Sequence, residues 1–146
     1  MADLFFASAC DADTEKAGGN LARALLADGR SYAFIALFGE MGVGKTAFTR
    51  GFCRALDISS VHSPTYTVVN EYMTGTHPVF HFDMYRITDE DDLYSIGFDD
   101  YLARDGYILC EWSENIEDFL PADLIRVTIT RTNDTTGREI RIEYPD

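Results

Sequence analysis

This sequence of 146 residues has no long apolar run, few cysteines and few lysines. No apolar run approaches the roughly 20 residues that a membrane-spanning helix needs, so we expect no membrane association and take the cytosol as the default location. The cysteines are Cys10, Cys53 and Cys110, an odd number with no C-x-x-C spacing, which favours reduced and mostly buried thiols. The three histidines show no metal-ligand spacing with them, which argues against a structural zinc site.

Positive charge is also scarce. Lysine and arginine together number 12 against 25 acidic residues, a formal net charge of −13, and Lys16 and Lys45 are the only lysines. The arginines are scattered, so no basic stripe is visible, and a polyanion such as RNA would be repelled. A role on nucleic acid would therefore be indirect, through a partner; the simpler alternative is that the acidity only keeps the protein soluble.

A glycine-rich segment between an apolar run and a helical pattern organises the chain. Residues 39–46 read Gly-Glu-Met-Gly-Val-Gly-Lys-Thr, which matches the phosphate-binding P-loop pattern G-x-x-x-x-G-K-[ST]. Backbone amides must close around phosphate oxygens, which requires glycine at Gly39 and Gly44. Lys45 can reach the β- and γ-phosphates and the Thr46 hydroxyl can bind Mg²⁺. The alternative, a strand-to-helix turn without a ligand, fits the flanking pattern less well.

The remaining patterns indicate an α/β protein. The expected strands are 4–7, 32–38, 68–72, 79–83 and 107–110, with a hairpin joining the third and fourth and a terminal hairpin from the alternating segments 125–129 and 140–144. The expected helices are 14–26, capped by Ser8 or Asp11, then 47–56, then 89–96, capped by Thr88, with a further helical turn at 101–102. Gly18 and Gly19 would let the first helix approach a strand or a nucleotide base closely. We predict that residues 1–146 form one P-loop ATPase domain, a three-layer fold with a mixed, mostly parallel sheet and a C-terminal β-hairpin.

Two acids stand where a P-loop protein needs a further carboxylate for Mg²⁺. Asp83 follows the apolar residues 79–82, and Glu111 follows the buried strand at 107–110. Ligands of open α/β sheets lie outside the carboxyl ends of strands, so both are candidates, although each could be an ordinary surface acid. Thr65 lies on a loop like a switch threonine that senses Mg²⁺ or γ-phosphate; its alternative is a turn hydroxyl. The sequence lacks an Asn-Lys-x-Asp segment, which would indicate a guanine nucleotide, so an adenine nucleotide is the default.

These blocks together resemble one protein family, TsaE, also called YjeE. The similarity rests on the segment 39–46, on Ser63-Pro64-Thr65-Tyr66-Thr67, on His81-Phe82-Asp83-Met84-Tyr85-Arg86, on Glu111-Trp112, and on Thr14 and Gly18 in the first helix. The resemblance implies a bacterial ATPase that supports threonylcarbamoyladenosine formation on tRNA together with the TsaB–TsaD complex. It would contact tRNA only indirectly.

The same resemblance implies roles for individual residues. Lys45 would bind phosphate, Thr46 and Glu111 would hold Mg²⁺, Asp83 would be the acid needed for hydrolysis, and Thr65 would belong to a switch-like loop. The ATP or ADP site would include Glu40, Met41, Gly42, Val43, Gly44, Lys45, Thr46 and Ala47, with Asp11, Thr14 and Arg138 near the adenine.

The hypothesis from the sequence is thus a Mg²⁺-dependent ATPase that is slow without partners. Arg86 is the best internal candidate for a transition-state arginine, with a salt bridge to the acids at 89–92 as its alternative. One rival is a small-molecule kinase with the same loop, although no arginine-rich lid is visible. A second is a nucleotide-gated binding module that needs no turnover. Trp112 lies beside Glu111 and should report nucleotide binding by fluorescence.

Overall fold

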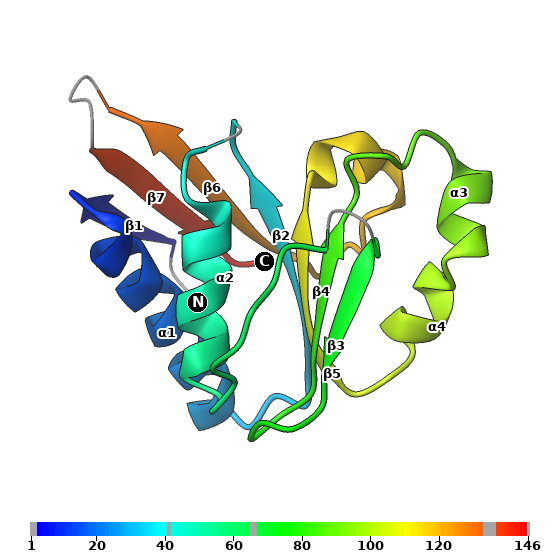
Figure 1. Cartoon of the computed structure of the whole chain (residues 1–146), viewed down its shortest axis with the longest axis horizontal. Coiled ribbons are helices and arrows are strands. Elements are labelled where there is room, and N and C mark those ends of the chain that lie inside the picture. Colours follow the sequence, from blue (N-terminus) through cyan, green and yellow to red (C-terminus); the bar gives the residue numbers. More distant parts are fainter. Residues whose placement is uncertain (1–2, 41, 65–66, 133–136, 146) are drawn as a thin grey trace.

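A single mixed sheet organises the computed structural model, which describes residues 3–40, 42–64, 67–132 and 137–145. Within these residues seven strands follow the order β1-β7-β6-β2-β5-β4-β3 (Figure 1). The strands are β1 (Leu4–Ser8), β2 (Tyr32–Phe38), β3 (Val69–Tyr72), β4 (Val79–Asp83), β5 (Gly106–Glu111), β6 (Ile125–Arg131) and β7 (Arg138–Glu143). The helices are α1 (Asp11–Ala27), α2 (Lys45–Arg54), α3 (Glu90–Ser95), α4 (Phe98–Leu102) and the 3-10 helix η1 (Ser113–Phe119).

The strands in the middle of the sheet are parallel and those at its margins are antiparallel. The pairs β6–β2, β2–β5 and β5–β4 are parallel, whereas β1–β7, β7–β6 and β3–β4 are antiparallel. Half of the described pairings are therefore parallel, so the expectation of a mostly parallel sheet holds only for its centre. The predicted hairpins β3–β4 and β6–β7 are both confirmed.

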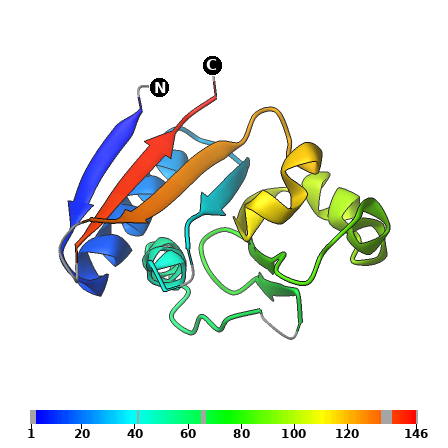
Figure 2. The same cartoon turned by 90° about the horizontal axis from the view of Figure 1, so that it is seen from above.

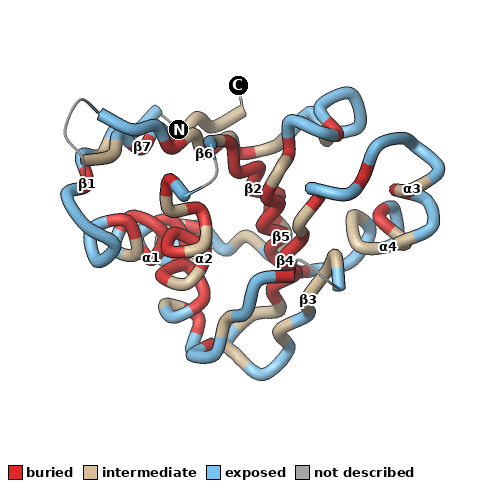
Figure 3. Tube along the Cα trace, turned by 45° about the horizontal axis from the view of Figure 1, so that its top comes forward, coloured by how far each residue is buried: buried red, intermediate tan, exposed pale blue. Residues whose placement is uncertain are grey.

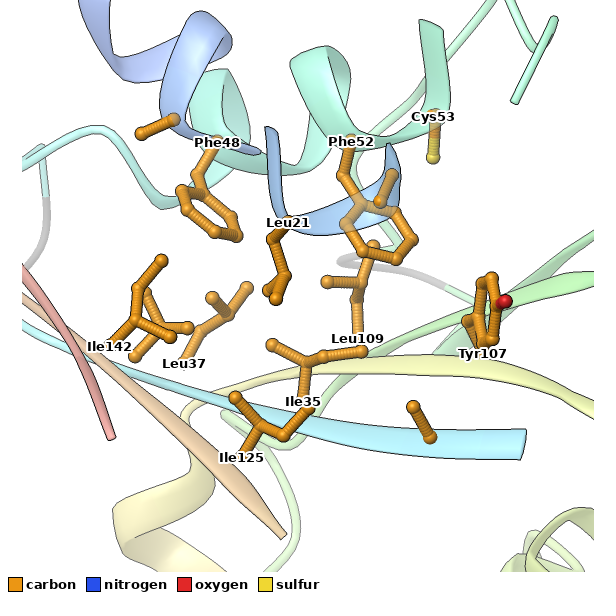
Figure 4. Close-up of a cluster of buried hydrophobic side chains, with 14 of the residues drawn as sticks. Leu21, Ile35, Leu37, Phe48, Phe52, Cys53, Tyr107, Leu109, Ile125 and Ile142 are labelled. Carbon is orange, nitrogen blue, oxygen red and sulfur yellow. The ribbon is translucent and has the colours of Figure 1, made fainter. Parts of the chain in front are cut away.

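Helices cover both faces of this sheet (Figures 1 and 2). Residues 33–38 of β2 and all of β5 are buried, as expected for parallel strands with a layer on each side (Figure 3). On one face, Leu21 of α1 and Phe48 and Phe52 of α2 pack on strand side chains that include Ile35 (Figure 4). On the other face, Leu93 of α3, Phe98 of α4 and Ile116 of η1 complete a second cluster, which includes Phe34 and Phe82.

Helices α1 and α2 touch backbone to backbone. A Cβ atom at Gly18 would overlap the carbonyl oxygen of Phe48, and one at Gly51 would overlap the carbonyl oxygen of Glu15. Glycine is therefore required at both crossing points. Gly18 permits close approach to a second helix, where the sequence had suggested a strand or a base.

Most predicted elements are present with shifted ends. Helix α1 begins at Asp11, after Cys10 as its N-cap, so neither Ser8 nor Asp11 caps it; the Asp13 carboxylate instead accepts a hydrogen bond from the Ala9 N–H. Helix α3 is capped by Asp89 rather than Thr88, because the Asp89 carboxylate reaches the Asp92 N–H.

Two features of the described fold and one cysteine differ from what the sequence indicates. The 3-10 helix η1 and the pairing of β1 with β7 were not predicted. Cys53 and Cys110 are buried free thiols, as expected, but Cys10 is exposed. Among the described residues, no helix combines the length and the apolar character needed to cross a membrane.

Candidate functional site

Three strands and one helix converge on the candidate site. Strands β2, β4 and β5 are neighbours with the same direction, so their carboxyl ends lie along one edge of the sheet, which is the upper edge in Figure 1. The loop from Gly39 to Gly44 leaves β2 at this edge and leads into the first turn of α2. Such an edge is where open α/β sheets place their ligands.

The loop backbone depends on its glycines. Gly39, Gly42 and Gly44 have φ angles of 147°, 80° and 109°, all in the region that side chains disfavour. A Cβ atom at Gly39 would also lie 2.5 Å from the carbonyl oxygen of Ile129. The loop can therefore hold its shape only with glycine at these positions, as predicted for Gly39 and Gly44. Met41 lies outside the described residues.

Lys45, the first residue of α2, is 6% exposed and is held by the loop that precedes it. Its ammonium donates a hydrogen bond of 2.8 Å to the carbonyl oxygen of Gly39. The same nitrogen lies 4.4 Å from the centre of the Trp112 ring, within cation–π range. The charge of Lys45 is thus fixed inside the loop, at the positive end of a helix.

The two acids predicted from the sequence are opposite each other across a parallel strand pair. Asp83 ends β4, Glu111 ends β5, and the two are register partners. The Asp83 carboxylate accepts the backbone N–H of Tyr85 at 2.9 Å. Burial raises the pKa of Asp83 above its ordinary value and Glu111 adds to this, while the Tyr85 hydrogen bond, His81 and Lys45 oppose it.

Glu111 has a partner that the sequence did not suggest. Its Oε2 atom lies 2.5 Å from Nε2 of His81, a side chain with no exposed surface. His81 and Asp83 are two residues apart on β4, so their side chains lie on the same face of the sheet.

A pocket of about 480 Å³ joins most of these groups. Its lining residues come from α1, the loop, α2, the segment between α2 and β3, and the ends of β4 and β5 with the residues just after them: Asp11, Gly42, Gly44, Lys45, Thr46, Ala47, Arg50, Ser63, Asp83, Tyr85, Glu111 and Trp112. Arg50 and Tyr85 were not predicted as site residues. Arg50 could have been found from its spacing, because it follows Thr46 by four positions on one helix.

A second pocket of about 270 Å³ lies next to the first and shares Asp11 and Gly42 with it. Thr14, Val43 and Arg138 also line it, so the residues predicted near an adenine lie together. The Arg138 Nε atom donates a hydrogen bond of 3.2 Å to the carbonyl oxygen of Val43. The Thr14 hydroxyl is buried and lies 2.7 Å from that of Ser8.

Glu40, another predicted site residue, is not among the described residues that line either pocket. Its side chain is 83% exposed and pairs with Arg131 at 3.1 Å, and its carbonyl oxygen accepts the Val43 N–H at 3.4 Å. Thr65 lies outside the described residues.

Backbone strain flanks the site. Val68 and Trp112 have φ angles of 67° and 58°, which bulky residues rarely adopt. The carbonyl oxygen of Val68 accepts the Asp83 N–H at 2.8 Å, and Trp112 directly follows Glu111 and packs its ring 5.0 Å from that of Tyr85. Such strain is typical of functional sites, where the surrounding structure holds it in place.

The oxygen ligands at this pocket suit Mg²⁺. Among the described residues no cluster of three or more His, Cys, Asp or Glu side chains could bind a metal by itself. Mg²⁺, however, is commonly bound through one or two protein ligands together with substrate phosphates. Thr46, Asp83 and Glu111 line one pocket, so the donor set fits a Mg²⁺–phosphate group and does not fit a protein-only metal site.

Comparison with known proteins identifies relatives of this chain. The model of the family described as "Threonylcarbamoyl adenosine biosynthesis protein TsaE" matches residues 9–140. The Bacillus subtilis protein named tRNA threonylcarbamoyladenosine biosynthesis protein TsaE is 41% identical over 101 residues, 68% of this chain and 63% of the relative. The Haemophilus influenzae protein of the same name is 39% identical over 105 residues, 71% of this chain and 66% of the relative.

The match therefore spans slightly less than two thirds of the length of these two relatives. A Rickettsia bellii relative with the same name is 32% identical over 124 residues, covering 84% of this chain and 85% of that protein. Among solved structures, that of Bacillus subtilis YdiB superimposes with a TM-score of 0.82 at 29% identity, covering 99% of this chain and 87% of the other. The chain thus belongs to the TsaE family of threonylcarbamoyl adenosine biosynthesis proteins.

Proposed function

We propose that this protein is a Mg²⁺-dependent ATPase that supports threonylcarbamoyladenosine formation on tRNA by acting on the TsaB–TsaD complex. One observation carries the enzymatic part of the proposal. Lys45, Thr46, Asp83 and Glu111 line one pocket at the amino end of α2, beside a loop whose glycines adopt positive φ angles. Family membership supports the link to tRNA modification.

Each side chain has a distinct role in this proposal. Lys45 and the loop amides bind the β- and γ-phosphates, so Lys45 exchanges its contact with the Gly39 carbonyl for the phosphate. Thr46 and Glu111 would hold Mg²⁺, which would supply positive charge against the phosphates. Asp83, whose pKa burial raises, orients or activates the attacking water. Thr65, which lies outside the described residues, would sense Mg²⁺ or the γ-phosphate.

The nucleotide base would lie in the second pocket. That pocket shares Asp11 and Gly42 with the phosphate pocket, so one elongated ligand can occupy both. Asp11, Thr14 and Arg138 would surround the adenine, and the backbone from Glu40 to Ala47 would follow the phosphates. ATP or ADP is therefore the proposed ligand.

The charge of the protein supports indirect action on tRNA. A net charge of −13 opposes binding to a polyanion, whereas docking on a protein complex does not require a basic surface. The proposed site of action is the cytoplasm, where tRNA is modified.

Phosphate release from ATP, measured with the purified chain alone and with purified TsaB–TsaD, tests this proposal. We expect slow turnover alone and a sharp rise with the partners, because the partners supply activating contacts. If the partners had no effect and a small hydroxylated metabolite raised turnover instead, the protein would be a kinase. If the chain bound to TsaB–TsaD in the presence of ATP without turnover, it would be a nucleotide-gated binding module.

A further inference from the structure

A buried histidine holds the carboxylate that is proposed to bind Mg²⁺. His81 has no exposed surface, and its Nε2 atom lies 2.5 Å from Oε2 of Glu111, which is 30 residues away in the sequence and on the adjacent strand. Its other ring nitrogen, Nδ1, is buried and has no hydrogen-bond partner among the described residues. Among the described residues, the His81 ring therefore makes one hydrogen-bonding contact, and its partner, Glu111, lines the pocket.

The unpaired Nδ1 atom indicates which ring nitrogen carries the proton. A proton on Nδ1 would leave a buried N–H donor without an acceptor and would set the Nε2 lone pair against the Glu111 carboxylate. The favoured arrangement has the proton on Nε2, which then donates to the Glu111 carboxylate. Such a hydrogen bond to a charged acceptor is short and directional.

The contact sets the orientation of Glu111. One carboxylate oxygen is held by the ring, so rotation about the last side-chain bond is restricted and the other oxygen has a defined direction. Glu111 ends β5 and lines the same pocket as Thr46, so its second carboxylate oxygen could bind a cation there. Carboxylates that bind metals are commonly held in this way, and loss of the supporting hydrogen bond weakens metal affinity.

The position of His81 on its strand links it to the second acid. Strand β4 carries His81 and Asp83 on one face, and β5 carries Glu111 as the register partner of Asp83. One strand thus supplies both the proposed hydrolytic acid and the group that holds the proposed metal ligand.

We propose that His81 is a positioning residue that orients Glu111 toward Mg²⁺ in the nucleotide complex. This inference rests on the proposed function of the same pocket. A purely structural role for the pair is the alternative, and it predicts equal effects on nucleotide binding with and without metal.

Two substitutions of similar length separate these roles. In His81→Gln the side-chain amide can still donate to Glu111, whereas His81→Met fills the same space without a donor. ADP affinity is measured by calorimetry with Mg²⁺ and with EDTA, for both variants and the unmodified chain, and thermal unfolding checks the fold. We expect His81→Met to lower affinity roughly 10-fold with Mg²⁺ and little with EDTA, and His81→Gln to retain most of the Mg²⁺ effect.

A background substitution tests whether His81 acts through Glu111. In a Glu111→Gln chain, His81→Met should cause no further loss of Mg²⁺-dependent affinity, because the carboxylate that it positions is already absent. A full additional loss would overturn the proposal, as would equal losses with Mg²⁺ and EDTA in the single variant.

A measurement on the unmodified protein covers the case in which the variants do not fold. The ring nitrogens of ¹⁵N-labelled His81 are followed by NMR in the ADP complex before and after Mg²⁺ is added. We expect an Nε2–H signal that shifts with Mg²⁺; an unchanged signal would overturn the proposal. If the unmodified chain bound no nucleotide at all, the proposed function would fail first, which separates the two outcomes.

Discussion

The two faces of the sheet are packed by different means. On the face that carries the candidate site, α1 and α2 meet backbone to backbone at Gly18 and Gly51, and Glu15 of α1 forms ion pairs with Arg50 and Arg54 of α2 at 3.6 and 2.7 Å. On the opposite face, the short helices α3 and α4 pack through side chains. Phe98 meets Phe34 and Phe82 edge to face, with ring centres 6.0 and 5.7 Å apart.

This difference matters because α2 carries the phosphate-binding candidates. Backbone contacts fix the position of α2, and with it Lys45 and Thr46, more tightly than interchangeable side chains could. The opposite face supports the sheet. None of the described residues that line the larger pocket belongs to α3 or α4. We therefore expect changes on the first face to affect ligand binding and changes on the second to affect mainly stability.

The largest expected effect is on the site itself. Lys45→Ala should abolish ATP binding with the fold intact, because it removes the charge that is proposed to bind the phosphates. Calorimetry should be used, since Lys45 also contacts the Trp112 ring and its loss would alter fluorescence by itself. Normal ATP affinity in this variant would contradict the phosphate-site assignment.

A core substitution on the opposite face should affect stability alone. Phe98→Ala removes two edge-to-face ring contacts and leaves a cavity, so we expect a loss of about 3–5 kcal/mol in the free energy of unfolding. Nucleotide affinity per folded molecule should be unchanged. Urea unfolding and calorimetry at a temperature where the variant is folded would check this, and a parallel loss of affinity would show that the two faces are coupled.

The helix crossing on the site face should behave differently. In Gly51→Ala the new methyl group meets the Glu15 carbonyl, so α2 must shift, and we expect a loss of about 1–3 kcal/mol together with weaker ATP binding. Gly29→Ala is a matched control, because it is also a glycine-to-alanine change but its Cβ meets open space. The φ angle of 69° at Gly29 makes alanine strained there, so this variant should also lose stability. The control should retain full affinity at a comparable loss of stability.

Within the site, Glu111→Ala should separate metal from nucleotide. We expect roughly a 10-fold loss of ADP affinity with Mg²⁺ and a smaller loss with EDTA, because the proposed role of Glu111 is to hold the cation. Titration by calorimetry under both conditions provides the test. An unchanged dependence on metal would mean that Glu111 is structural.

The smallest expected effect is a gain of stability at Asp83. Burial raises the pKa of this carboxyl in the folded protein, so the folded state binds its proton more tightly than the unfolded state does. Stability is therefore lost as the pH rises from the ordinary Asp value near 3.9 through the folded value. Asp83→Asn keeps an acceptor for the Tyr85 N–H and removes this cost, so the variant should be more stable at pH 7 and inactive in hydrolysis.

Urea unfolding at a series of pH values from 7 down to the ordinary Asp value near 3.9 checks the sign of this effect. The advantage of Asp83→Asn over the unmodified chain should shrink as the pH falls through the folded pKa toward that value. An advantage that grows as the pH falls would contradict the assignment of the effect to the carboxylate charge.

Local patterns in the sequence were sufficient for much of this description. Strand β2, the glycine-rich loop and the β6–β7 hairpin could be predicted. Each is determined by residues close together in the sequence: an apolar run, the glycines, and the alternation of apolar and polar residues. Helix η1 could not, because it buries only Ser113 and Ile116 and is held by distant contacts, such as the hydrogen bond from the Asn115 amide to the Met84 carbonyl. The pairing of His81 with Glu111 depends on the register between β4 and β5, which the sequence does not specify.

Trp112 can report whether the pocket beside Lys45 binds a Mg²⁺–nucleotide. Its ring contacts the Lys45 ammonium and lies beside Tyr85 at the pocket, so phosphate binding at Lys45 should change its emission. Since Trp112 is the only tryptophan, the signal comes from this one position. We expect a saturable change on titration with Mg²⁺–ATP. An unchanged emission together with no heat of binding would show that the pocket does not bind the nucleotide.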